Sequence, residues 1–504
     1  MSASFTETSR ELRKLLRQSS HYGLGLLGNL ALGFVSFPVF TRVFSVADYG
    51  LIDLTQKTLL FATAFSKAGL QNSALRFYDA PAFRADFEKA RQYYSTMFFG
   101  VVSTAVIATA AFSAGIGLIP ASFLDGPLGS ILRLGAILIF LRSLQSILWS
   151  FMRIEERTKA YNLISLAMRI ATFLAVCACL PWMGKSVRTY YSATIAVESA
   201  FVAAICVFLL RRGALQPGRF DRKLFLAALA FGSPLIVQEV AGVLLESGDR
   251  ALVLHYLGAG SLGFYSVAYG LSNYINNFLI TPLGLAILPI YMRIWTAEGP
   301  EKTVAFLSDA LDWFLMAGFC VLAVASLAAH DAVLLLASPK YRGADQLMPL
   351  IVAGLLLYTT HVFLNAGLVI YKQTRRMAMI LGWSAVVNIT LNCLLLPRIG
   401  LRAAALASLI GYATCIGLLL RVSGKTMRLR IRAAAVVRYS VVAIVTFLAV
   451  SHLDFRSSFW NTFGKASLGT LVYVVLMLVL DQRVRTLARR VLHRSAAREA
   501  AMAA

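Results

Sequence analysis

The chain has 504 residues, of which 58% are hydrophobic, and its mean hydropathy is +0.71. Soluble domains are about 45–50% apolar, so this composition excludes a soluble globular protein. A net charge of +24 would indicate nucleic-acid binding in a soluble protein, but membrane proteins collect Lys and Arg in cytoplasmic loops, so no nucleic-acid partner is expected.

Apolar segments long enough to cross a bilayer recur along the whole chain, which predicts an all-α, polytopic membrane protein with about fourteen transmembrane helices. Met1 to Ser20 is polar and basic and leads directly into the first segment, so no removable signal peptide is expected. The segment 262–290 contains Pro282 and Pro289, so it is expected to bend or end early. The predicted helices are 22–42, 51–75, 93–118, 130–151, 160–182, 190–210, 224–247, 262–290, 304–328, 347–371, 377–397, 401–421, 437–453 and 463–480.

The basic residues set the orientation of these helices. With the N-terminus inside, roughly 33 of the 48 Lys and Arg fall in or beside cytoplasmic segments, against roughly 10 in the opposite loops. Both termini are therefore predicted to be cytoplasmic. For the tail from Arg483 to Arg498 two interpretations are open: a basic amphipathic helix on anionic lipid, or a solvated, loosely ordered segment.

An internal repeat divides the chain. The stretch FSVADYGLI follows the first predicted helix and LGAGSLGFY follows the seventh, and they align when Gly50 is placed on Gly263. A second pair, MRIEERTKAYN and VIYKQTRRMAM, follows the fourth and tenth helices at nearly the same offset. Transporters are often built from such repeats, with the substrate site between them. The predicted divisions are a basic cytoplasmic arm (1–21), a six-helix lobe (22–210), a basic linker (211–223), a second, pseudo-symmetric six-helix lobe (224–421), two extra helices (422–480) and a basic cytoplasmic tail (481–504).

Three stretches are similar to a known family: FPVFTRVFSVADYGLIDLTQ (37–56), YLGAGSLGFYSVAYGLSNYINN (256–277) and VVNITLNCLLLPRIGLRAAALASLIGY (386–412). Through them the chain resembles the Wzx-type polysaccharide flippases of the multidrug/oligosaccharidyl-lipid/polysaccharide exporter superfamily. The resemblance covers nearly the whole chain and its order of elements. It implies a two-lobed transporter with a V-shaped central cavity that rocks between inward-open and outward-open states.

The resemblance also implies the cargo and the location. The cargo would be an oligosaccharide repeat unit on undecaprenyl diphosphate, moved from the cytoplasmic to the periplasmic leaflet of a bacterial inner membrane for surface or exopolysaccharide synthesis. Membrane lipids, a polysaccharide polymerase and a chain-length regulator would be its partners. The alternatives are a cation-coupled multidrug exporter of the same fold and a lipid II flippase. The serine-arginine-leucine-glycine pattern of lipid II flippases is not seen in the first helix.

Charged residues within predicted spans mark the candidate transport site. A central Arg costs about 2.5–3.5 kcal/mol on insertion scales, so such groups usually face a cavity or a partner. Arg142 and Arg169 lie too far from the helix ends to reach the surface easily, and they are the main candidates for binding a diphosphate. Gln145 and Trp149 share a helical face with Arg142 and would contact sugar. The alternative is structural, with Arg169 forming an ion pair with Glu198.

Two lysines of the second predicted helix are further cavity candidates, each with an alternative. Lys57 lies four residues after Asp53, so the two can form an ion pair on one helix face. Lys67 is nearer the cytoplasmic end and can extend its ammonium group to the interface. Arg133 lies about 180° around its helix from Arg142 and is predicted to be interfacial.

Two acidic residues lie on one face of the seventh predicted helix. Glu239 and Glu246 are seven residues apart, or about 10 Å along the axis. Either carboxylate can couple H+ or Na+ movement to transport, or the two can balance arginines of the first lobe across the cleft; both interpretations are open. Gly232–Pro234 and Pro282–Pro289 are either hinges for rocking or fixed kinks.

No enzyme chemistry or metal site is expected. The sequence has no GxxxxGK[ST] loop for ATP, and the predicted loops are under roughly 20 residues. All six cysteines lie in apolar segments, without a CxxC pair or a histidine at ligand spacing, and are interpreted as packing residues. Apart from a coupling ion, H+ or Na+, no cofactor is predicted.

Overall fold

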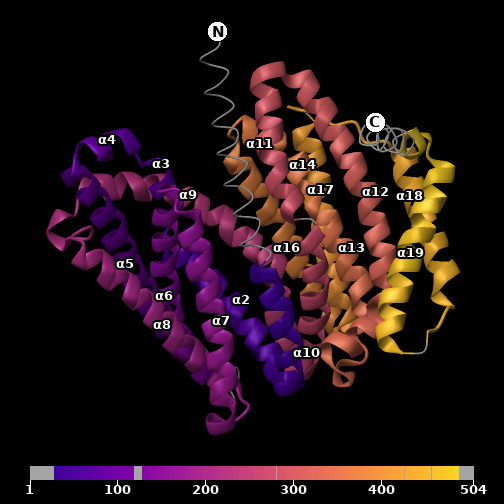
Figure 1. The fold of residues 1–504 in the computed structure, drawn as a ribbon, viewed down its shortest axis with the longest axis horizontal. Helices are drawn as coiled ribbons and strands as arrows, with labels where there is room; N and C mark the ends of the chain where they lie inside the picture. The colour runs from indigo at the N-terminus through magenta and orange to yellow at the C-terminus, as the bar shows by residue number, and fades with distance from the viewer. Residues whose placement is uncertain (1–27, 119–127, 280, 425, 456, 487–504) are drawn as a thin grey trace, which may run out of the picture.

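The computed structural model describes residues 28–118, 128–279, 281–424, 426–455 and 457–486, and all regular elements in these ranges are helical. The helices form two lobes side by side (Figure 1). The first lobe slants inward to meet the upright second lobe along α2 and α10, and the lobes separate toward the side where α4 and α11 lie. The N-terminal arm 1–21 lies outside the described residues.

The first lobe encloses its own apolar core, which includes Phe44, Leu59, Met97, Ile139 and Tyr191. Its helices alternate in direction because short turns connect them. Its described elements are helix 28–43, α2 (Val46–Ser66), α3 (Leu70–Arg76), α4 (Ala80–Ala85), α5 (Phe87–Leu118), α6 (Leu128–Ile154), α7 (Thr158–Met183) and α8 (Val187–Arg211).

The second lobe has a separate core around Leu245, Leu311, Phe363 and Tyr412, and the last two helices pack on the outside of α12. The 3-10 turn η2 (Pro217–Arg219) connects the lobes. The remaining elements are α9 (Arg222–Ser247), α10 (Asp249–Leu279), α11 (Thr281–Glu298), α12 (Pro300–Ala332), η3 (Val333–Ala337), η4 (Pro339–Tyr341), η5 (Ala344–Leu347), α13 (Met348–Thr359), α14 (His361–Leu364), α15 (Ala366–Ile370), α16 (Thr374–Ile399), α17 (Arg402–Ser423), α18 (Ala433–Ser451) and α19 (Ser458–Leu480).

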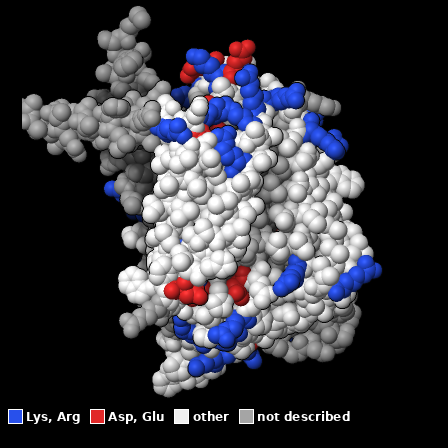
Figure 2. Space-filling view, turned by 90° about the vertical axis from the view of Figure 1, so that its right-hand side faces the viewer, with Lys and Arg blue, Asp and Glu red and all other residues white. Residues whose placement is uncertain are grey.

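Eleven described helical stretches are long and apolar enough to cross a membrane, and one of them, Arg222–Asn277, contains both α9 and α10. Counting these two separately and adding helix 28–43 and the more polar α2 gives the fourteen predicted segments. Figure 2 shows charged side chains near the two ends of the molecule and an uncharged belt between them. Such a belt matches the hydrocarbon layer of a bilayer.

Three predicted helices are not single helices with the predicted bounds. The segment 347–371 is divided into α13, α14 and α15. The segment 51–75 is not one helix, because α2 ends at Ser66 and the backbone turns at Ala68 and Gly69, both with positive φ. The segment 262–290 corresponds to α10 and α11, and the residues 248–261, predicted to be a loop, are largely helical with a kink at Gly258. Arg250 and Val253 of this stretch are buried where the lobes meet, so tertiary contacts hold it in a helix.

The two glycines that align the repeat lie against each other where the lobes meet. A Cβ on Gly263 would lie 2.0 Å from the carbonyl oxygen of Val46, and one on Gly50 would lie 2.6 Å from the amide nitrogen of Gly263. The backbones of α2 and α10 therefore touch, which no larger residue allows. The two positions that the predicted repeat aligns therefore meet at the crossing of the two lobes.

Gly263→Ala is expected to lower the unfolding temperature markedly, because the added methyl must push the α2 backbone away. Overpacking usually costs about 1–3 kcal/mol, and a backbone carbonyl has less freedom to move than a side chain. Thermal unfolding in detergent measures the effect. Gly260→Ala on the same helix is the control, since a Cβ there meets nothing within 4 Å. Equal melting of the two variants would contradict this account.

Helix α9 joins the lobes by a second close backbone contact. A Cβ on Gly69 would lie 2.2 Å from the carbonyl oxygen of Gly232, and Ser73 donates a hydrogen bond of 2.6 Å to the carbonyl of Ala228. From this crossing α9 continues along α16 of the second lobe, and Pro234 lies inside it without ending the helix. The glycine before Pro234 is therefore a packing contact in this structure.

Candidate functional site

A polar cavity of about 410 Å³ lies within the first lobe. Helix 28–43, α2, α6, α7 and α8 form its walls. Most side chains in membrane-spanning helices are apolar. When polar groups from five helices meet in one space, they either pair with one another or serve a function. The charged residues that line it are Arg142, Arg169 and Glu198.

Arg142 projects from α6 and is bound on two sides. Its Nε lies 3.3 and 3.4 Å from the two carboxylate oxygens of Glu198, and its Nη2 lies 3.1 Å from Oε1. Its Nη1 donates a 2.8 Å hydrogen bond to Gln56 on α2. The carboxylate thus occupies the two-pronged edge that guanidinium groups use for carboxylates and phosphates. The predicted ion pair of Arg169 with Glu198 is wrong, because Arg142 takes that partner.

Arg169 lies on α7, and its side chain is exposed at the cavity. It makes no hydrogen bond or ion pair with the described residues. Thr172 and Phe173 follow it along the same helix and line the same space. A guanidinium in the middle of a span that has no partner among the described residues could bind an anion, because it is always charged and carries a planar set of donors.

The two predicted neighbours of Arg142 on α6 separate in the structure. Gln145 lines the cavity, with its amide 3.1 Å from the sulfur of Met168. Trp149 lies one turn further along, outside the residues that line the cavity, with its ring edge-on to Tyr161 at 5.5 Å. Tyr190 adds a ring and a hydroxyl that were not predicted, and Gln56 lies 3.4 Å from that hydroxyl.

The structure also shows the surroundings of the two candidate lysines of α2 and of the two acidic residues of α9. Lys67 forms an ion pair of 2.6 Å with Glu239, which ties the end of α2 to α9. Lys57 is half-buried, forms no ion pair within 4 Å among the described residues, and interacts electrostatically with Glu246. The Glu246 side chain is exposed and has no hydrogen bond to the described part of the chain. Of the two acidic candidates, Glu246 alone keeps its carboxylate available.

Sequence reasoning missed a buried charge cluster where the lobes meet. Arg250 is 1% exposed, and its Nε lies 2.8 Å from Asp53 of the first lobe. Its Nη1 lies 3.2 Å from Asp249, and its guanidinium carbon stands 4.4 Å above the ring of Tyr269. The alternative in which Asp53 pairs with Lys57 gives no ion pair within 4 Å among the described residues, although the two charges interact electrostatically. The signal was present in the adjacent charges of Asp249 and Arg250, but both lay in the predicted loop.

Polar groups of the second lobe complete this cluster. The hydroxyl of Tyr265 hydrogen-bonds the carboxylate of Asp249, which also accepts a 3.0 Å bond from Ser408 on α17. Tyr269 and Tyr412 share a hydrogen bond of 2.7 Å. The second-lobe side chains of this cluster are buried, and none of them lines the first-lobe cavity.

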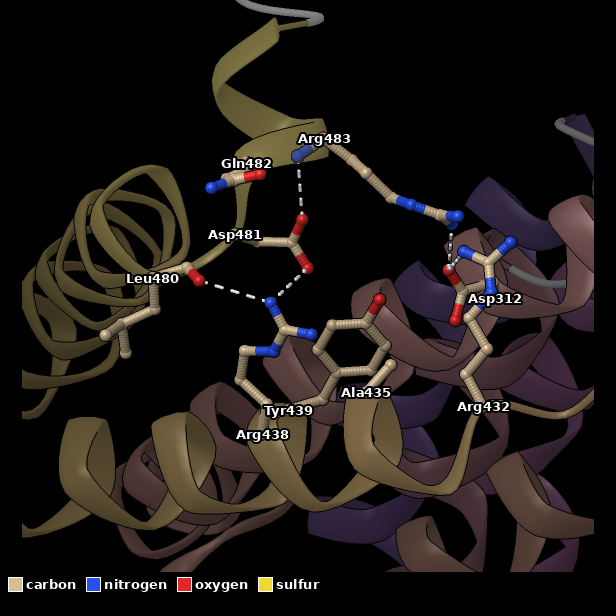
Figure 3. Close-up of a pocket in the computed structure, with 9 residues that line it drawn as sticks. All are labelled: Asp312, Arg432, Ala435, Arg438, Tyr439, Leu480, Asp481, Gln482 and Arg483. Carbon is tan, nitrogen blue, oxygen red and sulfur yellow. Dashed lines mark hydrogen bonds and ion pairs between the residues drawn. The ribbon is translucent and has the colours of Figure 1, made fainter.

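A second charged cavity, of about 390 Å³, lies between α12, the start of α18 and the end of α19 (Figure 3). Arg438 contacts Asp481 at 3.1 Å, while Arg432 and Arg483 approach Asp312 at 3.7 and 3.2 Å. Each of these arginines forms an ion pair with a carboxylate, and these ion pairs hold the last two helices against each other and against α12. Of the predicted tail 481–504, residues after 486 lie outside the described part of the chain.

The described residues contain no cluster of three or more His, Cys, Asp or Glu that could hold a metal ion, and the six cysteines are unbridged. The polar groups that line the cavity are guanidinium, carboxylate, amide and hydroxyl groups.

Comparison with known proteins identifies the sequence family and the fold. A family model described as "Polysaccharide biosynthesis protein" matches residues 15–295. The structure is similar to the lipid II flippase MurJ in an inward closed conformation, with a TM-score of 0.72 and 14% identity over 92% of this chain and 99% of that one. No curated protein sequence matches the chain.

Two other solved structures share the fold. An inward-facing multidrug resistance MATE family transporter has a TM-score of 0.61 and 14% identity, covering 88% of this chain and 95% of that one. A MOP superfamily transporter from Pyrococcus furiosus, described as having a binding pocket of reversed polarity, has a TM-score of 0.56 and 13% identity, covering 81% and 95%. The expected resemblance to a polysaccharide biosynthesis family is confirmed, and so is the expected all-helical fold, which these solved structures share.

Proposed function

The chain belongs to the polysaccharide biosynthesis protein family, and from this premise we propose that it flips undecaprenyl-diphosphate-linked oligosaccharide repeat units across the membrane. The cargo moves from the cytoplasmic to the periplasmic leaflet by alternating access, for surface or exopolysaccharide synthesis. The observation that carries the proposal is the first-lobe cavity, where Arg169 offers a guanidinium that forms no hydrogen bond or ion pair with the described part of the chain. The protein acts as a transporter and not as an enzyme.

The diphosphate explains why a cation is kept inside the lobe. A diphosphate that crosses a bilayer loses its hydration and must exchange it for fixed donors. Arginine is always charged and binds phosphate oxygens with a planar fork, so Arg169 supplies such donors. Gln145 and Tyr190 line the same space and supply the amide and aromatic surfaces that sugars use. The lipid tail stays outside, in the gap between lobes.

Rocking of the lobes about the α2–α10 contact would alternate access. The lobes meet there and separate toward the opposite side, as Figure 1 shows. We place both termini and the open side in the cytoplasm of a bacterial inner membrane, following the distribution of basic residues. Glu246 is our candidate for coupling H+ or Na+, since Glu239 is neutralised by Lys67. A polysaccharide polymerase and a chain-length regulator would act on the delivered unit.

Deletion of the gene tests the proposal. We expect lost surface polysaccharide and undecaprenyl-diphosphate-linked units trapped on the cytoplasmic face, with both defects corrected by the wild-type gene. Loss of polysaccharide without trapped units would reject a flippase. Sensitivity to toxic cations with normal polysaccharide would indicate a multidrug exporter instead, and accumulation of lipid II would indicate a lipid II flippase. The net positive cavity favours the anionic cargo over organic cations.

A further inference from the structure

The cavity carries its own anion beside the two arginines. Glu198 projects from α8 with a side chain 10% exposed, and it faces Arg142, whose side chain is 21% exposed. Its two oxygens approach Nε and Nη2 of that arginine together. This is the geometry in which a phosphate group would bind the same edge. While the pair is intact, Arg142 cannot offer that edge to cargo.

Arg142 and Arg169 therefore differ in their readiness to bind an anion. Both line one cavity, but only Arg169 is without a protein partner among the described residues. With Glu198 ionised the three groups sum to one positive charge; with its charge removed or turned away they sum to two. An entering diphosphate carries several negative charges, so it is attracted by the arginines and repelled by the carboxylate.

We propose that Glu198 is an exchangeable counter-ion, which holds Arg142 when the cavity is empty and yields that arginine to the diphosphate of the cargo. This inference rests on the proposed function and deepens it. Cargo first contacts the free Arg169, and its second phosphate then displaces Glu198 from Arg142. When cargo leaves, the carboxylate re-forms the ion pair and so competes with rebinding. Glu198 acts through Arg142 and is a positioning residue.

A purely structural ion pair makes the opposite prediction. If Glu198 only held α8 against α6, its neutralisation would loosen the cavity and weaken binding of every ligand. A counter-ion that competes with cargo gives tighter anion binding when it is neutralised. Gln keeps the size of Glu198 and an acceptor for Arg142, so Glu198→Gln separates the two roles. A gain of affinity is not expected from structural damage.

The test is equilibrium binding of inorganic pyrophosphate to the full-length protein in detergent, at about 0.15 M salt so that surface charges are screened. We expect Glu198→Gln to bind about tenfold more tightly than wild type, the size of one charge-assisted contact. Glu88→Gln is the matched control. It removes the same charge from an exposed group that contacts Arg91 and Arg219, and it should bind like wild type.

A second comparison does not depend on the folding of one variant. Arg142→Gln leaves Glu198 facing the ligand and should weaken binding, and adding Glu198→Gln should restore it to within about threefold of wild type. Glu198→Gln binding no tighter than wild type, or no restoration in the double variant, would overturn the counter-ion role alone. Absent binding to wild type, or binding undiminished in Arg169→Gln, would overturn the proposed site together with this inference.

Discussion

Arg169→Ala is expected to abolish most export while leaving the protein folded in the membrane. The side chain has no hydrogen bond or ion pair with the described residues, so its loss leaves no carboxylate without a partner. What disappears is the free guanidinium, and a charge-assisted contact is worth about 1.5–3 kcal/mol. Export should therefore fall to roughly a tenth or less of wild type, measured as surface polysaccharide in a complemented deletion strain.

The control for this prediction is another arginine within a span of the same lobe. Arg133 lies on α6 with an exposed side chain and does not line the cavity, so Arg133→Ala should export normally. Arg169→Lys should be intermediate, since lysine keeps the charge but not the planar fork. Normal export by Arg169→Ala, at wild-type protein level, would remove this residue from the transport site.

Arg250→Met is expected to cause the largest loss of stability. The side chain is almost completely buried, and its removal leaves Asp53 and Asp249 without their cation. Breaking a buried pair from one side costs about 3–5 kcal/mol, because a desolvated charge remains. Since Asp53 and Arg250 belong to different lobes, we also expect the contact between the lobes to weaken. Thermal unfolding in detergent measures the first effect.

Two comparisons make this second prediction specific. Arg432→Met removes an arginine whose carboxylate contacts are 3.6 and 3.7 Å long and whose side chain is 43% exposed, so its cost should be at most about 1 kcal/mol. Adding Asp53→Asn to Arg250→Met should recover part of the lost stability, since one stranded charge is removed. Equal melting temperatures for Arg250→Met and Arg432→Met would show that the buried cluster does not stabilise the lobe contact.

Several site residues could be predicted because a charge within an apolar segment is visible in the sequence. Arg142 and Arg169 were found this way and Gln145 by its helical spacing from Arg142, and the structure places all three in one cavity. Trp149 was grouped with them by helical spacing, yet it does not line the cavity. Spacing shows which residues share a face of one helix, but it does not show how far along that face the cavity extends. Tyr190 was missed because an aromatic residue near a helix end is common in any membrane protein.

The ion pairs could not be predicted, because each joins helices that are distant in sequence. Spacing suggested Asp53 with Lys57, but the structure pairs Asp53 with Arg250. Likewise Glu198 meets Arg142 and not Arg169. Which of two nearby cations reaches a carboxylate depends on how each helix is rotated about its axis. Helix rotation is fixed by packing across the whole lobe, which no local pattern records.

The sequence by itself determined the membrane class, the fourteen apolar segments and the positions of the costly charges, because hydropathy and charge are local properties of the chain. It also aligned Gly50 with Gly263. Only the tertiary structure decided that these glycines touch, that Arg250 joins the lobes, and that Arg142 pairs with Glu198 while Arg169 has no partner among the described residues. Those outcomes depend on helix crossings and rotations, and these are set by packing the whole chain at once.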